Sequence, residues 1–228
     1  MKAAWEEVAF EFATYRNQSI GSIADETLVL LDSHLVRTQV LASSPLAAST
    51  QDVKLWQREL RQLKLFCHSW NKCKSSWCHL EPIFTSEDIA YQIPQELRLF
   101  RQVGASWKEL NEAAQANHIV LVVFRKENSL NTIEACCKTF ESIYVGFGKY
   151  VERKRQNFPR FYFLSDDELL SLLGDSHNID KLQSNVVKLF GAIDQLIVDV
   201  SKGTVLGFKS SLGETVVFQT PLLMRKPR

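Results

Sequence analysis

The sequence lacks the long apolar runs and the targeting signals that would place it in or across a membrane. No stretch reaches the roughly 18 consecutive apolar residues that a membrane-spanning helix needs. The first residues, Met1 to Phe12, carry three acidic side chains and no apolar core of a signal peptide. We therefore expect a cytoplasmic location and no membrane partner.

Charge of one sign is also scarce. The 228 residues contain 27 Lys plus Arg against 26 Asp plus Glu, which gives a formal net charge of +1. A chain this close to neutral has no general attraction for a phosphate backbone, so we expect no nucleic-acid partner. The apolar fraction of 45% and the charged fraction of 23% are those of an ordinary globular protein. Any electrostatic function must therefore be local.

Cysteines are few and odd in number, and they lack the C-x2-C spacing of structural zinc sites. On a helix turning about 100° per residue, Cys67 and Cys78 share one face and Cys73 lies on the other. Cys136 and Cys137 are adjacent, which in a helix indicates one buried and one exposed thiol. We expect five reduced thiols, no bound metal and no cysteine nucleophile.

A nucleotide-binding loop is missing too. Phosphates are held by the G-x-x-x-x-G-K-[ST] pattern, whose backbone N–H groups surround them. The segment Gly146 to Lys149 lacks both the upstream glycine and the final Ser or Thr. The carboxylates of Asp166, Asp167 and Glu168 are explained by a helix dipole rather than by a glycosidase pair. We therefore expect no catalytic residue and no cofactor-binding residue in this chain.

What the sequence does contain is helical periodicity. From Asp52 to about Leu80, apolar residues recur at a 3-4 spacing, which predicts one long helix with Pro82 just beyond its end. Trp56, Trp70 and Trp77 all lie on this stripe. Aromatic residues at helical spacing are more typical of core packing than of ligand stacking, so we predict that they face a neighbouring helix.

Other helices are predicted on both sides of this one. They are residues 1–45, with a break near Asn17 to Gly21; Ile93 to Leu110; and Ile133 to Val151. Asp25 is a candidate cap in the first region, and the small residues Ala47 to Thr50 form a linker after it. The run Ile119 to Phe124 is β-branched, and both a strand and a short helix or buried turn fit it.

The last third of the chain changes character. Phe161 to Leu164, after Pro159, is predicted to be a short aromatic strand or extended segment. Ser165 and Glu168 match the capping box that opens a helix, and Asn178 is a candidate cap for the next one. Three β-branched segments then predict an antiparallel meander with Gly-containing turns: Leu196 to Val200, Thr204 to Lys209 and Thr215 to Gln219.

The predicted fold class is therefore mostly α, an elongated helical bundle with a small antiparallel β meander near the C-terminus. We expect three parts. Residues 1–50 form an N-terminal helical segment, residues 51–160 form a central helical bundle, and residues 161–228 contain the capped helices and the meander.

Local charge is the most unusual feature. Between Lys149 and Arg160 the chain has five cations against one acid, a net charge of +4 in a chain whose total is +1. One interpretation is a solvated helix end whose cations complement its dipole. The other is a docking patch for an acidic surface. The residues of this candidate patch are Arg153, Lys154, Arg155 and Arg160.

The run from Tyr150 to Ser165, YVERKRQNFPRFYFLS, closely resembles a signature of dynein heavy chains, and DDELL follows it as in that family. Upstream, WCHLEPIF from Trp77 resembles the family's W-x-x-L-E-x-I-F segment. SLGETV from Ser211 is similar to its S-x-x-G-E hairpin. The sequence is thus identified as a member of this family, in the linker region (N-terminal region 2) before the AAA+ ring. The signature residues, expected to be structural, are Phe158, Pro159, Phe161, Tyr162, Phe163, Trp77, Glu81, Gly213 and Glu214.

The resemblance implies a mechanical function without a catalytic site in this fragment. In dyneins the linker is a lever that transmits ATP-driven changes of the AAA+ ring into minus-end-directed movement along microtubules. ATP and Mg would bind in the ring of the parent protein, a motor ATPase. A generic helical protein-interaction scaffold is the alternative function.

The resemblance also implies partners and a location. The AAA+ ring of the same heavy chain is the intramolecular partner, and the basic patch would dock on it in one mechanical state. Dynein intermediate, light intermediate and light chains and microtubules would bind other parts of the parent. The implied location is the cytoplasmic microtubule cytoskeleton, with the axoneme or cilium left open because the sequence leaves both subfamilies open.

Overall fold

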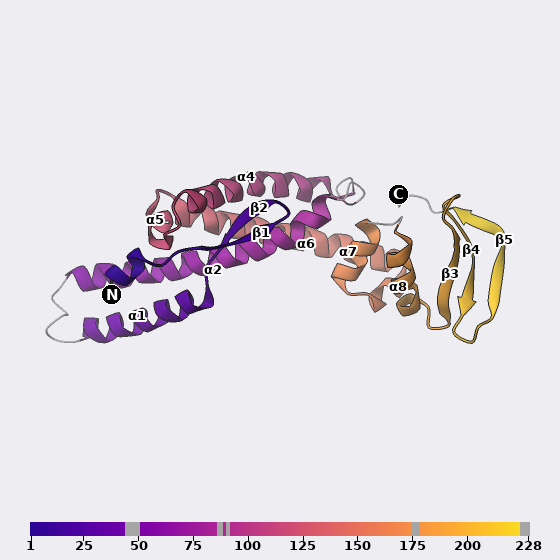
Figure 1. Ribbon diagram of the computed structural model, residues 1–228, viewed down its shortest axis with the longest axis horizontal. Coiled ribbons are helices and arrows are strands. Elements are labelled where there is room, and N and C mark those ends of the chain that lie inside the picture. Colours follow the sequence, from indigo (N-terminus) through magenta and orange to yellow (C-terminus); the bar gives the residue numbers. More distant parts are fainter. Residues whose placement is uncertain (44–50, 86–88, 90–91, 175–177, 224–228) are drawn as a thin grey trace. The chain divides into compact units, whose positions relative to one another are not determined.

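Helix accounts for most of the chain, as the 3-4 apolar periodicity predicts (Figure 1). The computed structural model describes residues 1–43, 51–85, 89, 92–174 and 178–223, so the predicted linker Ala47 to Thr50 lies outside the described residues. The helices are α1 (Asp25–Ser43), α2 (Gln51–Thr85), α4 (Pro94–Ala116), α5 (Val120–Arg125), α6 (Ser129–Asn157), α7 (Asp166–Gly174) and α8 (Ile179–Leu189). None of the described helices is both long enough and apolar enough to span a bilayer.

Two compact units divide the chain. Unit 1 consists of Met1–His79 and Leu99–Ser142, and unit 2 of Leu80–Arg98 and Ile143–Arg228. The three-part division expected from the sequence stays a prediction. The mostly α fold with a C-terminal meander is confirmed.

Trp70 of α2 is the centre of the core of unit 1. Its side chain is fully buried, and its ring lies 4.6 Å from that of Phe10 and 5.1 Å from that of Trp107, centroid to centroid. Its indole N–H donates to the carbonyl of Gly21 at 2.8 Å. Trp77 is only half-buried and stacks on a ring of α4, 4.7 Å away. Core packing of the tryptophan stripe is thus confirmed for Trp70.

The N-terminal region begins with a hairpin, so the helix predicted before residue 17 is wrong. A 3-10 turn, η1 (Ala3–Glu6), precedes strands β1 (Glu11–Tyr15) and β2 (Gln18–Ser22), which pair antiparallel. The turn residues Arg16 and Asn17 both have positive φ, 44° and 65°, which is the requirement of a type I′ turn. Figure 1 shows the hairpin lying along α2. The predicted break near Asn17 is therefore a strand-to-strand turn.

Helix α2 continues through Pro82 to Thr85, so the prediction that it ends before this proline is wrong. Proline has no backbone N–H, and the carbonyl four residues earlier, that of Cys78, loses its helical donor. The hydroxyl of Tyr15 in β1 donates to this carbonyl at 3.0 Å. A donor from the hairpin thus replaces the one that the proline removes.

The β-branched run from Ile119 forms the short helix α5 rather than a strand. Over the described residues, its β pairing is limited to one isolated bridge between Ala9 and Ile119. The N–H of Val120 donates to Val8 at 2.9 Å, and the helix then buries Val120 and Val123. Tertiary burial has overridden the β propensity of the run.

The helix caps predicted in the last third are confirmed. Ser165 Oγ accepts the N–H of Glu168 at 3.2 Å, and a carboxylate oxygen of Glu168 accepts the N–H of Ser165 at 3.0 Å. This is the reciprocal capping box that opens α7. At the start of α8, Asn178 Oδ1 accepts the N–H of Lys181 at 3.2 Å.

The predicted meander is also confirmed, as β3 (Ile193–Asp199), β4 (Thr204–Ser210) and β5 (Thr215–Leu223) in the order β3-β4-β5. Gly213 has φ +88°, which explains why a glycine stands in the β4–β5 turn. Gly207 is needed for a second reason. A Cβ there would lie 2.2 Å from the backbone oxygen of Val216, where the β4–β5 register shifts.

Candidate functional site: the basic end of α6

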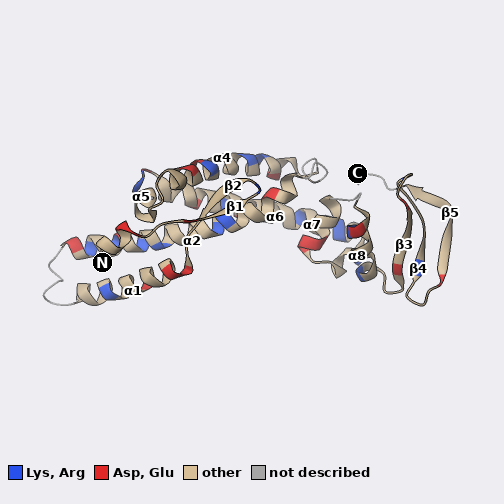
Figure 2. Cartoon of the chain, viewed as in Figure 1, with Lys and Arg blue, Asp and Glu red and all other residues tan. Residues whose placement is uncertain are grey.

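The basic segment occupies the last two turns of α6 and the turn that follows it. The helix ends at Asn157, and the 3-10 helix η2 (Pro159–Phe163) begins at a proline, whose backbone has no N–H to donate to a carbonyl four residues earlier. Figure 2 shows Lys and Arg in blue on α6 and the acidic residues of α7 in red. The charged residues are therefore positioned where one helix gives way to the next.

Arg155 is held inside this joint. Its guanidinium is 2.7 Å from the carboxylate of Asp166 and donates to the carbonyl of Leu164 at 2.8 Å. It also lies 5.7 Å from the ring centroid of Tyr162. Only 16% of the side chain is exposed. Because it binds the end of η2 and the first residue of α7 together, Arg155 is a structural cation.

Arg160 has a similar role toward α8. Its guanidinium donates to the carbonyl of Leu189, the last residue of that helix, at 2.8 Å and lies 4.6 Å from the ring centroid of Phe190. A cation at a helix C-terminus complements the dipole and satisfies a carbonyl that has no helical partner. Two of the four predicted patch residues are thus bound within unit 2.

The other two patch residues differ from these. Lys154 lies 5.4 Å from the ring centroid of Tyr150, and burial lowers its pKa, with the charge of Arg153 acting in the same direction. Arg153 is exposed, and among the described residues it forms no ion pair. Lys149 is exposed one turn earlier, on the same face. The spacing of four residues could have identified the Lys149–Arg153 pair from the sequence.

The aromatic segment is the 3-10 helix η2, so the predicted strand is wrong. The N–H of Phe161 donates to Phe158 at 2.9 Å, and that of Leu164 donates to Phe161 at 3.2 Å. Pro159 at the first position has the φ that such a turn requires. Side chains on consecutive residues of a turn cannot all face the core, and Tyr162 and Phe163 are 55% and 69% exposed.

The remaining signature residues occupy local structural positions. Trp77 stacks on Phe100 with an angle of 10° between the rings. Glu81 accepts a hydrogen bond from the Thr85 hydroxyl within α2. Gly213 and Glu214 form the β4–β5 turn, in which the N–H of Glu214 donates to the Ser210 hydroxyl at 3.1 Å. These placements favour a structural role, which stays a prediction for the signature as a whole.

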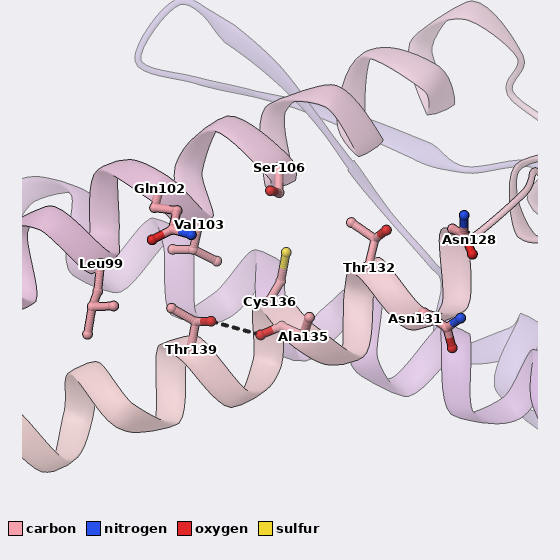
Figure 3. A pocket seen from close by; sticks show the side chains of 10 residues that line it. All are labelled: Leu99, Gln102, Val103, Ser106, Asn128, Asn131, Thr132, Ala135, Cys136 and Thr139. Carbon is pink, nitrogen blue, oxygen red and sulfur yellow. Dashed lines mark hydrogen bonds between the residues drawn. The ribbon is translucent and has the colours of Figure 1, made fainter.

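A pocket of about 500 Å³ lies between α4 and α6 in unit 1, and its lining side chains are uncharged (Figure 3). Cys136 points its sulfur into it, and Thr139 donates back to the carbonyl of Ala135 at 2.9 Å. This lining offers no acid or base for catalysis. Over the described residues, no group of three or more His, Cys, Asp or Glu is arranged to hold a metal ion.

The fold defines a mostly helical chain with a small C-terminal meander, and comparison with known proteins identifies its family. The family model described as "Dynein heavy chain, N-terminal region 2" matches residues 1–227. The chain therefore belongs to the dynein heavy chain family, in its N-terminal region 2.

Axonemal heavy chains are among its relatives. It is 34% identical to human dynein axonemal heavy chain 3 over 221 residues, or 96% of this chain. It is also 34% identical to mouse dynein axonemal heavy chain 12 over 199 residues and to rat dynein axonemal heavy chain 1 over 200 residues, or 86% of this chain in each case. The matches span only 5%, 6% and 4% of these relatives.

Proposed function

We propose that this chain is part of the linker of a dynein heavy chain, a lever that transmits ATP-driven changes of an AAA+ ring into movement along microtubules. The observation that carries the proposal is the match to N-terminal region 2 along almost the whole chain. ATP and Mg would bind in the ring of the parent protein rather than here. The axonemal relatives favour a cilium or axoneme as the location.

The described helices have properties that a lever needs. Helix α2 has 35 residues and α6 has 29, which correspond to lengths of about 52 and 43 Å at 1.5 Å per residue. A lever must not stretch under load. A continuous hydrogen-bonded helix whose side chains are close-packed on a core satisfies this requirement.

Force must also pass from α6 into the elements that follow it, and two arginines are placed to carry it. Arg155 joins α6 to η2 and to Asp166 of α7, while Arg160 joins η2 to the end of α8. A charge-assisted hydrogen bond of this kind is roughly twice as strong as a neutral one. We therefore assign these two cations to the joint at the end of α6 rather than to a docking surface.

The exposed pair, Lys149 and Arg153, is then the part of the basic segment that would dock on an acidic ring surface. Exposed ion pairs contribute about 0–1 kcal/mol each, so two of them bias a two-state equilibrium by on the order of 1 kcal/mol, or about fivefold. Such a bias weakens as salt is added. The AAA+ ring of the same heavy chain is the partner that this surface would meet.

The test separates the two pairs in a full-length motor. The double variant Lys149→Gln/Arg153→Gln is expected to lower the microtubule gliding velocity while basal ATPase and thermal stability stay unchanged. The double variant Arg155→Gln/Arg160→Gln is expected to lower both gliding velocity and the unfolding temperature, with basal ATPase retained. Lys126→Gln, an exposed cation at the end of α5, is the matched control.

Two results would contradict the proposal. If gliding velocity and ATPase fall in proportion in the Arg155/Arg160 variant, the joint does not transmit force. If the Lys149/Arg153 variant glides at the control velocity at low salt, these cations dock on nothing and only solvate the end of α6.

A further inference from the structure

Two buried thiols from different helices of unit 1 touch each other. The sulfur of Cys73 in α2 is 3.2 Å from the sulfur of Cys137 in α6, although the two residues are 64 positions apart in the chain. Cys73 is fully buried and Cys137 is 8% exposed. All five cysteines are free thiols. Both Cys136 and Cys137 are buried, so the prediction that one of this pair is exposed is wrong.

The second thiol of this pair can be reached from the surface. Cys137 lines a pocket of about 450 Å³ whose other walls are polar: His68, Ser69, Lys72, Glu134, Lys138 and Glu141. Lys72 and Glu141 form an ion pair of 2.6 Å beside it. A small, uncharged oxidant can therefore approach Cys137 from this pocket, whereas Cys73 lies behind it.

Cys137 and Cys73 differ in their readiness to ionise. The hydrogen bond between the two thiols lowers the pKa of Cys137; burial opposes this effect, and the charge of Lys72 supports it. The same hydrogen bond raises the pKa of Cys73, and burial raises it further. Burial also raises the pKa of Cys136, to about 11. Since the thiolate is the reactive form, oxidation should begin at Cys137.

We propose that Cys73 and Cys137 are an oxidisable dithiol, which hydrogen peroxide converts into a disulfide that joins α2 to α6. In the first step the Cys137 thiolate attacks one peroxide oxygen, the O–O bond breaks, and a sulfenic acid and hydroxide form. In the second step the sulfur of Cys73 attacks the sulfenic sulfur, and the S–S bond replaces the S–O bond. The Cys73 proton leaves with the hydroxyl group as water.

The geometry requires only a small movement. A disulfide has its sulfurs about 2.05 Å apart, so the pair must close by roughly 1.2 Å from the 3.2 Å of the reduced form. Once closed, the bond prevents α2 and α6 of unit 1 from separating. This inference concerns unit 1 alone and does not depend on the proposed lever function.

The experiment treats the folded 228-residue chain with hydrogen peroxide, blocks the remaining thiols by alkylation, and maps disulfide-linked peptides by mass spectrometry. A Cys73–Cys137 cross-link with the loss of two hydrogen atoms is expected. The oxidised chain should unfold on the order of 5–15 °C higher than the reduced chain, and a reductant should reverse the shift.

Three variants give the experiment its controls. Cys137→Ser should abolish the cross-link, and Cys73→Ser should leave a Cys137 sulfenic acid that a sulfenic-acid-specific probe traps. Cys136→Ser is the matched control, because this adjacent thiol faces the other pocket, and its cross-link should equal that of the wild type.

Peptide mapping of the wild type needs no variant and keeps the proposal falsifiable if a substitution prevents folding. The proposal is overturned if peroxide modifies Cys136 or Cys67 before Cys137. It is equally overturned if the Cys73–Cys137 bond forms only after denaturant has unfolded the chain.

Discussion

At the scale of single residues, the tryptophans of α2 show how one side chain can serve both packing and hydrogen bonding. Trp70 packs against rings from the hairpin and from α4, and its N–H binds the carbonyl of Gly21. Trp56 is almost as buried, yet its indole N–H has no hydrogen-bond partner among the described residues. Trp70 therefore contributes the more to the stability of unit 1.

We expect Trp70→Ala to lower the free energy of unfolding by about 3–5 kcal/mol, because it removes a fully buried indole from a close-packed core. Trp70→Phe keeps most of the ring packing and removes only the donor to Gly21, so a smaller loss of about 1–3 kcal/mol is expected. Urea denaturation measures both. A loss below about 1 kcal/mol for Trp70→Ala would mean that this ring does not form the core.

At the scale of elements, side chains at helix ends make several of the contacts that join the helices of unit 2. The carboxylate of Glu168 accepts the N–H of Ser165 and also binds the ammonium group of Lys188 in α8. One side chain thus both caps α7 and ties it to the next helix. Its hydrogen bond to Lys188, followed by that to the Ser165 backbone, lowers the pKa of Glu168.

This pKa predicts how the capping box responds to pH. A carboxyl group whose pKa is lower in the folded state adds stability above its unfolded value, here 4.5, and loses it as pH falls through the folded value. The destabilisation caused by Glu168→Gln should therefore be present at pH 7 and shrink below pH ~4. Urea denaturation at both pH values measures it. Ser165→Ala, which removes an uncharged acceptor, should cost about 1 kcal/mol at either pH; equal pH dependence of the two variants would refute the assignment.

Elements fixed by local chemistry could be predicted from the sequence, and those fixed by distant partners could not. Ser165 with Glu168 marks a helix start by itself, and Gly213 marks a turn by itself. The hairpin turn has no glycine, since Arg16 and Asn17 take the positive φ angles, so its signal was missed.

The candidate site, too, could be predicted from the sequence only in part. Its position came from the charge count between Lys149 and Arg160, which needs no structure. The different roles of its cations could not be predicted, because Arg160 and, beside its ion pair with Asp166, Arg155 also donate to the backbone carbonyls of Leu189 and Leu164. Every residue has a backbone carbonyl whatever its type, so no pattern of side chains could have shown the contacts to these carbonyls.

At the scale of the whole molecule, the lever role proposed above would need no nucleotide site within this chain. The segment Gly146 to Lys149, the nearest approach to a phosphate loop, lies within α6. Backbone N–H groups inside a helix already bind carbonyls four residues earlier, and so they are unavailable to a phosphate. We therefore expect any nucleotide response of the parent protein to originate outside this chain.

We therefore expect the isolated chain neither to bind nor to hydrolyse ATP. Isothermal titration calorimetry with Mg-ATP should give only heats of dilution, and phosphate release should equal that of a buffer blank. Saturable binding in the micromolar range would reveal a nucleotide site that the fold gives no reason to expect.

Because α2 contains Pro82, we expect its folding to depend on the order in which the chain is synthesised. Tyr15 is synthesised 67 residues before Pro82, so the hairpin that supplies the missing donor to Cys78 can form first. With this proline near its C-terminal end, α2 cannot satisfy the Cys78 carbonyl from its own backbone. We therefore expect the last turns of α2 to become fully hydrogen-bonded only after the N-terminal hairpin, which is synthesised earlier, has packed beside them.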